Sequence, residues 1–345
     1  METILFLAHT EADGTLARAA LETLTAARTA AAGLGDAELM VGLFGGKTQE
    51  GAAQTQGAGA KRILGVTGAD FSQPRYASDA AAAEALCREA KASIVICPAT
   101  SRMARVMSGV ALRLGGKVDT HITGLKAEGG VLSVNRWYYR QRMEAVLQRT
   151  QRPWVLLLEG GCHEAWKGTG GTASVEAVAL ALPENCKRTV VEGLKAPAND
   201  QQTIRPDAGI LLVAGAGWTK AQADGKAHVE DAEKIILDFL ECAQASLGGS
   251  KSVVDLGGEG QAVLRFMTHL NQIGQTGSTP RHAKGLSTCC HGEEPHVVGW
   301  RFINERRAID LDTNCGWAHG KADVLYVADA FEVMKKVNAL LGAKA

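Results

Sequence analysis

The stretch ETILFLAHTEADGTLARAALETLTAARTAAAGLGDAELMVGLFGG, residues 2–46, decides the fold of the N-terminal part of this chain. It places an alanine-rich segment with helical character, residues 16–32, between two short apolar runs, residues 4–8 and 39–44. Short apolar runs predict buried strands, and a helix between two such strands is typical of a βαβ unit. We therefore expect a parallel sheet with helices packed on it.

The same alternation continues along the chain. Further strands are expected at residues 62–66 and 93–97, and helices near residues 80–92 and 104–114. Between residues 118 and 158 the strand-like runs follow one another without an intervening helix, and glycines separate them. This pattern predicts antiparallel strands added to the parallel sheet.

The length of 345 residues predicts two domains. Residues 160–206 collect glycines, prolines and mixed charges, so we place an N-terminal α/β domain with its linker at residues 1–205 and a second domain at residues 206–345. The second domain is expected to contain strands at residues 209–214, 297–303 and 324–328, and helices at residues 229–247 and 331–341. The predicted fold class is α/β, with two three-layer α/β domains, of which the first has a nucleotide-binding-like parallel sheet.

Charge and hydropathy exclude several classes of partner and several cellular compartments. The 37 Lys and Arg residues balance 37 Asp and Glu residues, so no net charge attracts the chain to nucleic acid or an anionic membrane. The apolar run at residues 4–8 is too short for a signal peptide, and no later run approaches the roughly 18 residues of a membrane span. We expect a cytoplasmic protein with no membrane insertion, and its eight cysteines lack the C-x-x-C spacing.

Two glycine-rich turns only partly match nucleotide-binding motifs. Gly215 and Gly217 follow a predicted strand, but Lys220 stands where a dinucleotide fingerprint has its third glycine. The turn at residues 45–48 has one residue too few for a P-loop. We interpret the second of these as an ordinary turn after a strand.

A group of cysteines and histidines near residue 290 supplies possible zinc ligands. Its members are Cys289, Cys290, His291, His296, Cys315 and His319. Adjacent cysteines seldom coordinate one ion, and the spacing matches no common zinc site. Buried thiols with one histidine facing a ligand are the plainer interpretation, and a zinc or thiol enzyme using Cys289, Cys290 and His291 stays an alternative.

The segment IGQTGS, residues 273–278, is more informative because two glycines beside amide and hydroxyl side chains suit a phosphate or a polar heterocycle. The elements KSVVD (251–255), KGLS (284–287), FIN (302–304) and AD (322–323 and 328–329) surround it in order. Together they resemble the FAD-binding domain of the electron-transfer flavoprotein alpha subunit, with its GQTG, G-I-S, A-I-N and A-D-Y-G-I-V-x-D elements. PATSR (98–102) and QRPWV (151–155) are similar to landmarks of the family's N-terminal domain.

The resemblance implies that the second domain is a Rossmann-like FAD-binding domain. Lys251 would place a positive charge near the flavin, Thr276 would offer its hydroxyl near N5, and His291 would lie near O2. Gln275 and Ser287 would support the ring or the pyrophosphate, and Asn304 and Asp329 would contact the adenosine end. The implied cofactor-binding residues are Lys251, Gln275, Thr276, Gly277, Ser287, His291, Asn304 and Asp329.

The resemblance also implies a redox electron carrier rather than a catalyst of substrate turnover. Its partners would be a beta subunit, which would hold any AMP, a donor flavin dehydrogenase, and a membrane-associated iron-sulfur quinone oxidoreductase as acceptor. The chain departs from the family where Trp218 ends a turn that is usually G-G-R-G and where Lys251 replaces arginine. A nucleotide-binding regulatory protein is the other alternative, because the first domain alone suits that function.

Overall fold

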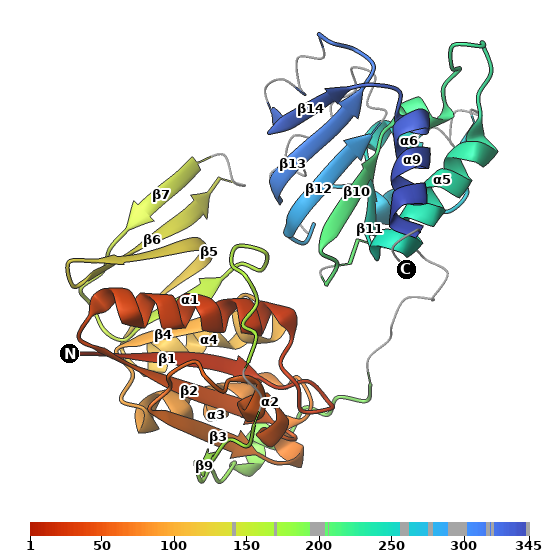
Figure 1. Ribbon diagram of the computed structural model, residues 1–345. Coiled ribbons are helices and arrows are strands. Elements are labelled where there is room, and N and C mark those ends of the chain that lie inside the picture. Colours follow the sequence, from red (N-terminus) through yellow and green to blue (C-terminus); the bar gives the residue numbers. More distant parts are fainter. Residues whose placement is uncertain are drawn as a thin grey trace. The chain divides into compact units, whose positions relative to one another are not determined.

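The computed structural model forms two compact units, Met1–Leu194 and Lys195–Ala345 (Figure 1). It describes residues 1–139, 143–168, 171–193, 204–205, 207–255, 262–274, 279–288, 302–314, 318 and 321–342. Both units are of the α/β class, as predicted. No helix in the described ranges combines the length and the apolar character that a membrane crossing needs.

The first unit is built on a nine-stranded sheet with the order β7-β6-β5-β8-β4-β1-β2-β3-β9. Its strands are β1 (Glu2–His9), β2 (Ala37–Gly45), β3 (Arg62–Thr67), β4 (Ile94–Pro98), β5 (Lys117–Glu128), β6 (Val131–Tyr138), β7 (Met143–Leu147), β8 (Trp154–Leu158) and β9 (Glu176–Ala177). The pairs β5–β6 and β6–β7 are antiparallel and the other pairs are parallel. The predicted parallel sheet with added antiparallel strands is therefore confirmed.

Helices cover both faces of this sheet (Figure 1). They are α1 (Arg18–Leu34), α2 (Gln49–Gln54), α3 (Tyr76–Glu89) and α4 (Ser101–Arg113), with short 3-10 turns η1 (Ala69–Phe71) and η2 (Glu184–Lys187). Because successive side chains of a strand point to opposite faces, Ile4 and Phe6 of β1 pack with α1, whereas Leu5 and Leu7 pack with α3 and α4. The continuous apolar run of β1 thus reflects burial on both faces.

The second unit is built on a five-stranded parallel sheet with the order β11-β10-β12-β13-β14. Its elements are β10 (Ile210–Ala214), η3 (Ala216–Thr219), α5 (Val229–Ala243), β11 (Ser246–Gly249), α6 (Lys251–Asp255), η5 (His269–Asn271), β12 (His282–Thr288), β13 (Ile303–Asp310), β14 (Val324–Val327) and α9 (Ala330–Gly342). Helices α5 and α9 pack side by side against one face (Figure 1).

The expected helix at residues 229–247 is wrong at its C-terminal end. Helix α5 ends at Ala243, and Gln244 adopts a left-handed conformation with φ +48°. The next residues form β11, whose Leu247 is buried. The apolar residues of the helix and of the strand form one uninterrupted pattern in the sequence, and no glycine or proline marks the boundary between them.

Candidate functional site

The strand order of the second unit creates a ligand-binding position at one edge of its sheet. The chain passes from β10 to β11 on one side and then returns to β12 on the other side of β10. In open α/β sheets, ligands bind beyond the carboxyl ends of the strands where the order reverses in this way. All five strands are parallel, so their carboxyl ends share this edge.

Three of the predicted cofactor-binding residues lie at this carboxyl edge. Lys251 begins α6, two residues after the end of β11, and its side chain is exposed. Ser287 is the next-to-last residue of β12. It is buried and lies beside Val213 of β10 in the sheet. Asp329 follows β14, and its Oδ1 atom accepts a hydrogen bond from the backbone nitrogen of Phe331 at 2.7 Å.

Asn304 is not brought together with these residues. It is the second residue of β13 and therefore lies at the opposite, amino edge of the sheet. Its Oδ1 atom accepts a hydrogen bond from Nη1 of Arg281 at 2.8 Å. Asp310, the last residue of β13, is six positions after Asn304, which corresponds to roughly 20 Å of extended chain.

Asp310 occupies the carboxyl end of β13 instead. Its side chain is buried, and Oδ1 accepts a hydrogen bond from the backbone nitrogen of Asp312 at 2.9 Å. Its Oδ2 atom is buried and has no hydrogen-bond partner in the described part of the chain. The sequence did contain a signal for this position, because residues 308–310 read A-I-D and match the A-I-N element as closely as residues 302–304 do.

Gln275, Thr276, Gly277 and His291 lie outside the described residues, as do the cysteines and the other histidines of the possible zinc site. The described residues on either side of residues 275–278 nevertheless have defined hydrogen bonds. The backbone nitrogen of Ile273 donates to the carbonyl of Gly249 at 3.1 Å, and that of Gly274 donates to Oγ1 of Thr279 at 2.7 Å. Gly274 and Thr279, the described residues on either side of the segment, thus lie together, and Ile273 joins them to the carboxyl end of β11.

Within the described residues, no group of three or more His, Cys, Asp or Glu side chains could hold a metal ion. The zinc alternative depends on residues 289–319, most of which are not described. Its six possible ligands all lie outside the described residues, so it stays a prediction.

The first unit has its own position of strand reversal, between β1 and β4. His9 ends β1, and its Nε2 atom lies 3.3 Å from Oγ1 of Thr100, the N-cap residue of α4. Burial, followed by the positive charge of Arg102, lowers the pKa of His9 below its ordinary value. A neutral imidazole is therefore favoured at the point where a nucleotide would enter such a sheet.

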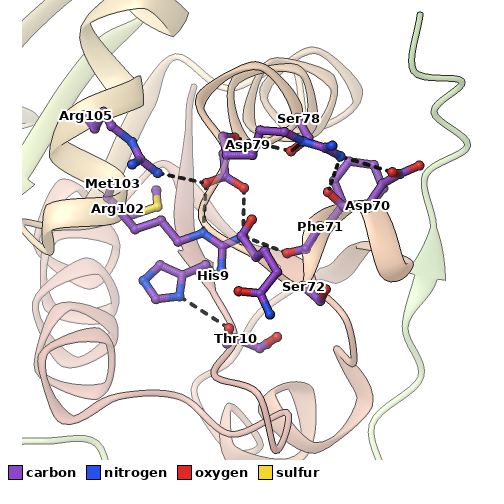
Figure 2. Close-up of polar contacts among 12 residues, drawn as sticks. His9, Thr10, Asp70, Phe71, Ser72, Ser78, Asp79, Arg102, Met103 and Arg105 are labelled. Atoms are coloured by element: carbon purple, nitrogen blue, oxygen red, sulfur yellow. Dashed lines mark hydrogen bonds and ion pairs between the residues drawn. The ribbon is translucent and has the colours of Figure 1, made fainter. Parts of the chain in front are cut away.

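The side chain of Arg102, however, hydrogen-bonds to other residues of the first unit (Figure 2). Its Nε and Nη2 atoms donate to the two carboxylate oxygens of Asp79 at 2.8 and 2.7 Å, and Nη2 also donates to the carbonyl of Phe71 at 2.6 Å. The guanidinium group lies 5.4 Å from the ring centre of Phe44. Arg102 belongs to the predicted PATSR landmark, and its described contacts show a structural tie between α4 and α3.

The family model for the electron transfer flavoprotein domain matches residues 4–185, which is more than half of the 345-residue chain. No curated protein matches the chain.

Proposed function

Because this chain belongs to the electron transfer flavoprotein family, we propose that it is the alpha subunit of a heterodimeric electron-transfer flavoprotein and that its second unit holds FAD. The observation that carries the proposal is the carboxyl edge of the five-stranded sheet, where Lys251, Ser287, Asp310 and Asp329 share one side. The family match itself covers the first unit, so the assignment of FAD to the second unit rests on this geometry and on the order of its motifs.

The buried carboxylate of Asp310 supplies a test of whether FAD fits this edge. Its Oδ2 atom lacks a donor in the described part of the chain. An unsatisfied buried acceptor costs about 1–3 kcal/mol, and the ribose hydroxyls of an adenosine group are donors that would satisfy it. In dinucleotide-binding sheets an acidic residue holds the ribose in this manner. The residues present therefore fit the adenosine end of FAD.

The remaining residues suit the rest of the cofactor. Bound FAD supplies the redox chemistry, so the protein has to bind, orient and electrostatically tune it. Lys251 brings a positive charge to the carboxyl end of β11, where the backbone of Gly249 hydrogen-bonds to that of Ile273. Ser287 and Asp329 lie at the ends of β12 and β14, on the side that Asp310 also occupies. Asn304 remains the alternative contact for the adenosine end.

We assign AMP to the beta subunit rather than to this chain. In the first unit the guanidinium of Arg102, in the first turn of α4, is bound to the buried Asp79, so its Nε and Nη2 atoms already have acceptors. The same contacts weigh against a nucleotide-binding regulatory protein, because that alternative relies on the first unit. A donor flavin dehydrogenase and a membrane-associated iron-sulfur quinone oxidoreductase complete the proposed electron path.

The test is the cofactor content of the full chain, purified alone and together with a beta subunit. The complex is expected to be yellow, with one FAD for each copy of this chain. The chain alone is expected to retain FAD poorly, because in this proposal the partner covers part of the cofactor. A colourless complex that retains AMP on this chain would support the regulatory alternative, and stoichiometric zinc would support the zinc enzyme.

A further inference from the structure

Trp218 lies in the turn that directly follows β10, at the carboxyl edge of the sheet. It lies in η3, and its side chain is completely buried. The turn begins at Gly215, whose backbone nitrogen donates to the carbonyl of Thr288 at 3.0 Å. The indole thus lies in the turn that follows β10, beside Thr288 at the end of β12, where the strand order reverses.

The indole nitrogen of Trp218 has a specific partner. It donates a hydrogen bond to Oγ1 of Thr288, the last residue of β12, at 2.9 Å. The same hydroxyl donates to the carbonyl of Val213 in β10 at 3.3 Å. Because the hydroxyl accepts one bond and donates the other, the rotamer of Thr288 is fixed by two groups from the β10 segment.

The ring of Trp218 also contacts α9. It packs against Phe331 at a centroid distance of 4.6 Å and an interplanar angle of 53°. Phe331 lies in the first turn of α9, and its backbone nitrogen donates to the carboxylate of Asp329. One buried side chain therefore contacts the segments that carry two proposed cofactor-binding residues, Ser287 and Asp329.

We propose that Trp218 is a positioning residue for the cofactor, which sets the spacing between the end of β12 and the start of α9 through Thr288 and Phe331. This inference rests on the proposed FAD site in the second unit. Trp218 is too deeply buried to be a surface contact itself, so it acts through the segments that it ties together. A neutral hydrogen bond at a buried position is worth enough to bias one arrangement of those segments over others.

The test measures the FAD dissociation constant, the visible circular dichroism of bound flavin and the thermal midpoint of the full chain with its beta subunit. Trp218→Phe keeps an aromatic ring against Phe331 but removes the N–H donor together with part of the larger indole ring, whereas Thr288→Val removes the acceptor and keeps the shape of the side chain. Each is expected to weaken FAD binding about three- to tenfold and to alter the flavin dichroism, as for a lost neutral hydrogen bond. The double variant should bind no more weakly than the worse single variant, because the two residues act as one pair.

Trp154→Phe is the matched control. Trp154 is also fully buried and also donates through Nε1, to Oδ2 of Asp119 at 2.8 Å, but it lies in the first unit. This variant is expected to lower the thermal midpoint and to leave the FAD dissociation constant within about twofold of wild type. Thr288→Ser keeps the hydroxyl and should restore normal binding, so it carries the comparison with Thr288→Val if Trp218→Phe does not fold.

The proposal is overturned if Trp218→Phe and Thr288→Val bind FAD as the wild type does, or if Trp154→Phe weakens binding as much as they do. If the wild-type complex binds FAD and these variants bind it equally well, only the role of Trp218 is rejected and the proposed function stands. A wild-type complex without FAD rejects both this role and the proposed function.

Discussion

Arg102 and Asp79 form a two-bond ion pair that joins α4 to α3 in the first unit, with N–O distances of 2.8 and 2.7 Å (Figure 2). Asp79 is completely buried and Arg102 is 10% exposed, so the pair is shielded from water. The two residues are 23 positions apart in the sequence. Asp79 therefore binds the guanidinium of Arg102 at the edge of the sheet where a nucleotide-binding sheet would bind a phosphate.

Asp79→Asn should lower the free energy of unfolding of the first unit by about 3–5 kcal/mol, because it leaves the Arg102 guanidinium buried without its counter-charge. Denaturant titration of the full chain measures this change. The control is Glu128→Gln, which breaks the ion pair with Lys126, in which the two side chains are 70% and 66% exposed, and should cost less than about 1 kcal/mol. Equal losses in the two variants would show that the buried pair contributes no more than a surface one.

Asp310→Ala should weaken FAD binding about tenfold or more, because a hydrogen bond to a charged group contributes about 1.5–3 kcal/mol. Asn304→Ala should leave FAD binding nearly unchanged, because Asn304 lies at the other end of β13. Fluorescence titration of the flavin-free complex compares the two variants. The reverse result, with loss only in Asn304→Ala, would return the adenosine contact to Asn304.

Lys251→Ala should lower the reduction potential of the bound flavin, because a nearby cation favours the added negative charge. An effect on the order of 1 kcal/mol, roughly 20 mV for a two-electron couple, is reasonable for a partly solvated charge. Lys251→Arg keeps the charge and should keep the potential. Spectroelectrochemical titration measures all three proteins, with Lys335→Ala of α9 as the control for a lost surface lysine. Identical potentials throughout would remove Lys251 from the site.

Asp119 should make the first unit less stable in acid. Burial by itself raises the pKa of Asp119, but hydrogen bonds from Arg149 and Trp154 outweigh it and hold the pKa below its ordinary value of 3.8. The unfolded carboxylate therefore binds a proton more readily than the folded one. The stabilisation is full above about pH 4 and is lost as the pH falls through the lower folded pKa.

Asp119→Asn tests this dependence. The difference in unfolding free energy between wild type and variant should be largest near neutral pH and should shrink below about pH 4. Urea titrations over this pH range measure the difference. A gap that stays constant down to pH 3, on the order of one unit below the unfolded value, would mean that ionisation of Asp119 contributes nothing.

The sequence by itself determined the class of each unit and the family. The apolar runs at residues 4–8 and 39–44 flank a helical segment, and a parallel sheet covered on both faces buries such runs. Each run is apolar by its own composition. Its burial can therefore be predicted without knowing which elements pack against it. The order of short motifs also carried the family assignment, because order along the chain is a property of the sequence.

Only the tertiary structure decided which end of a strand each residue occupies. The letters F-I-N at residues 302–304 and A-I-D at residues 308–310 are equally good matches to one motif, yet β13 places Asn304 and Asp310 at opposite edges of the sheet. Strand boundaries depend on pairing with β12 and β14, which the local sequence does not contain. The contact of Trp218 with Thr288 has the same cause, because residues 70 positions apart meet only after β12 has paired with β10.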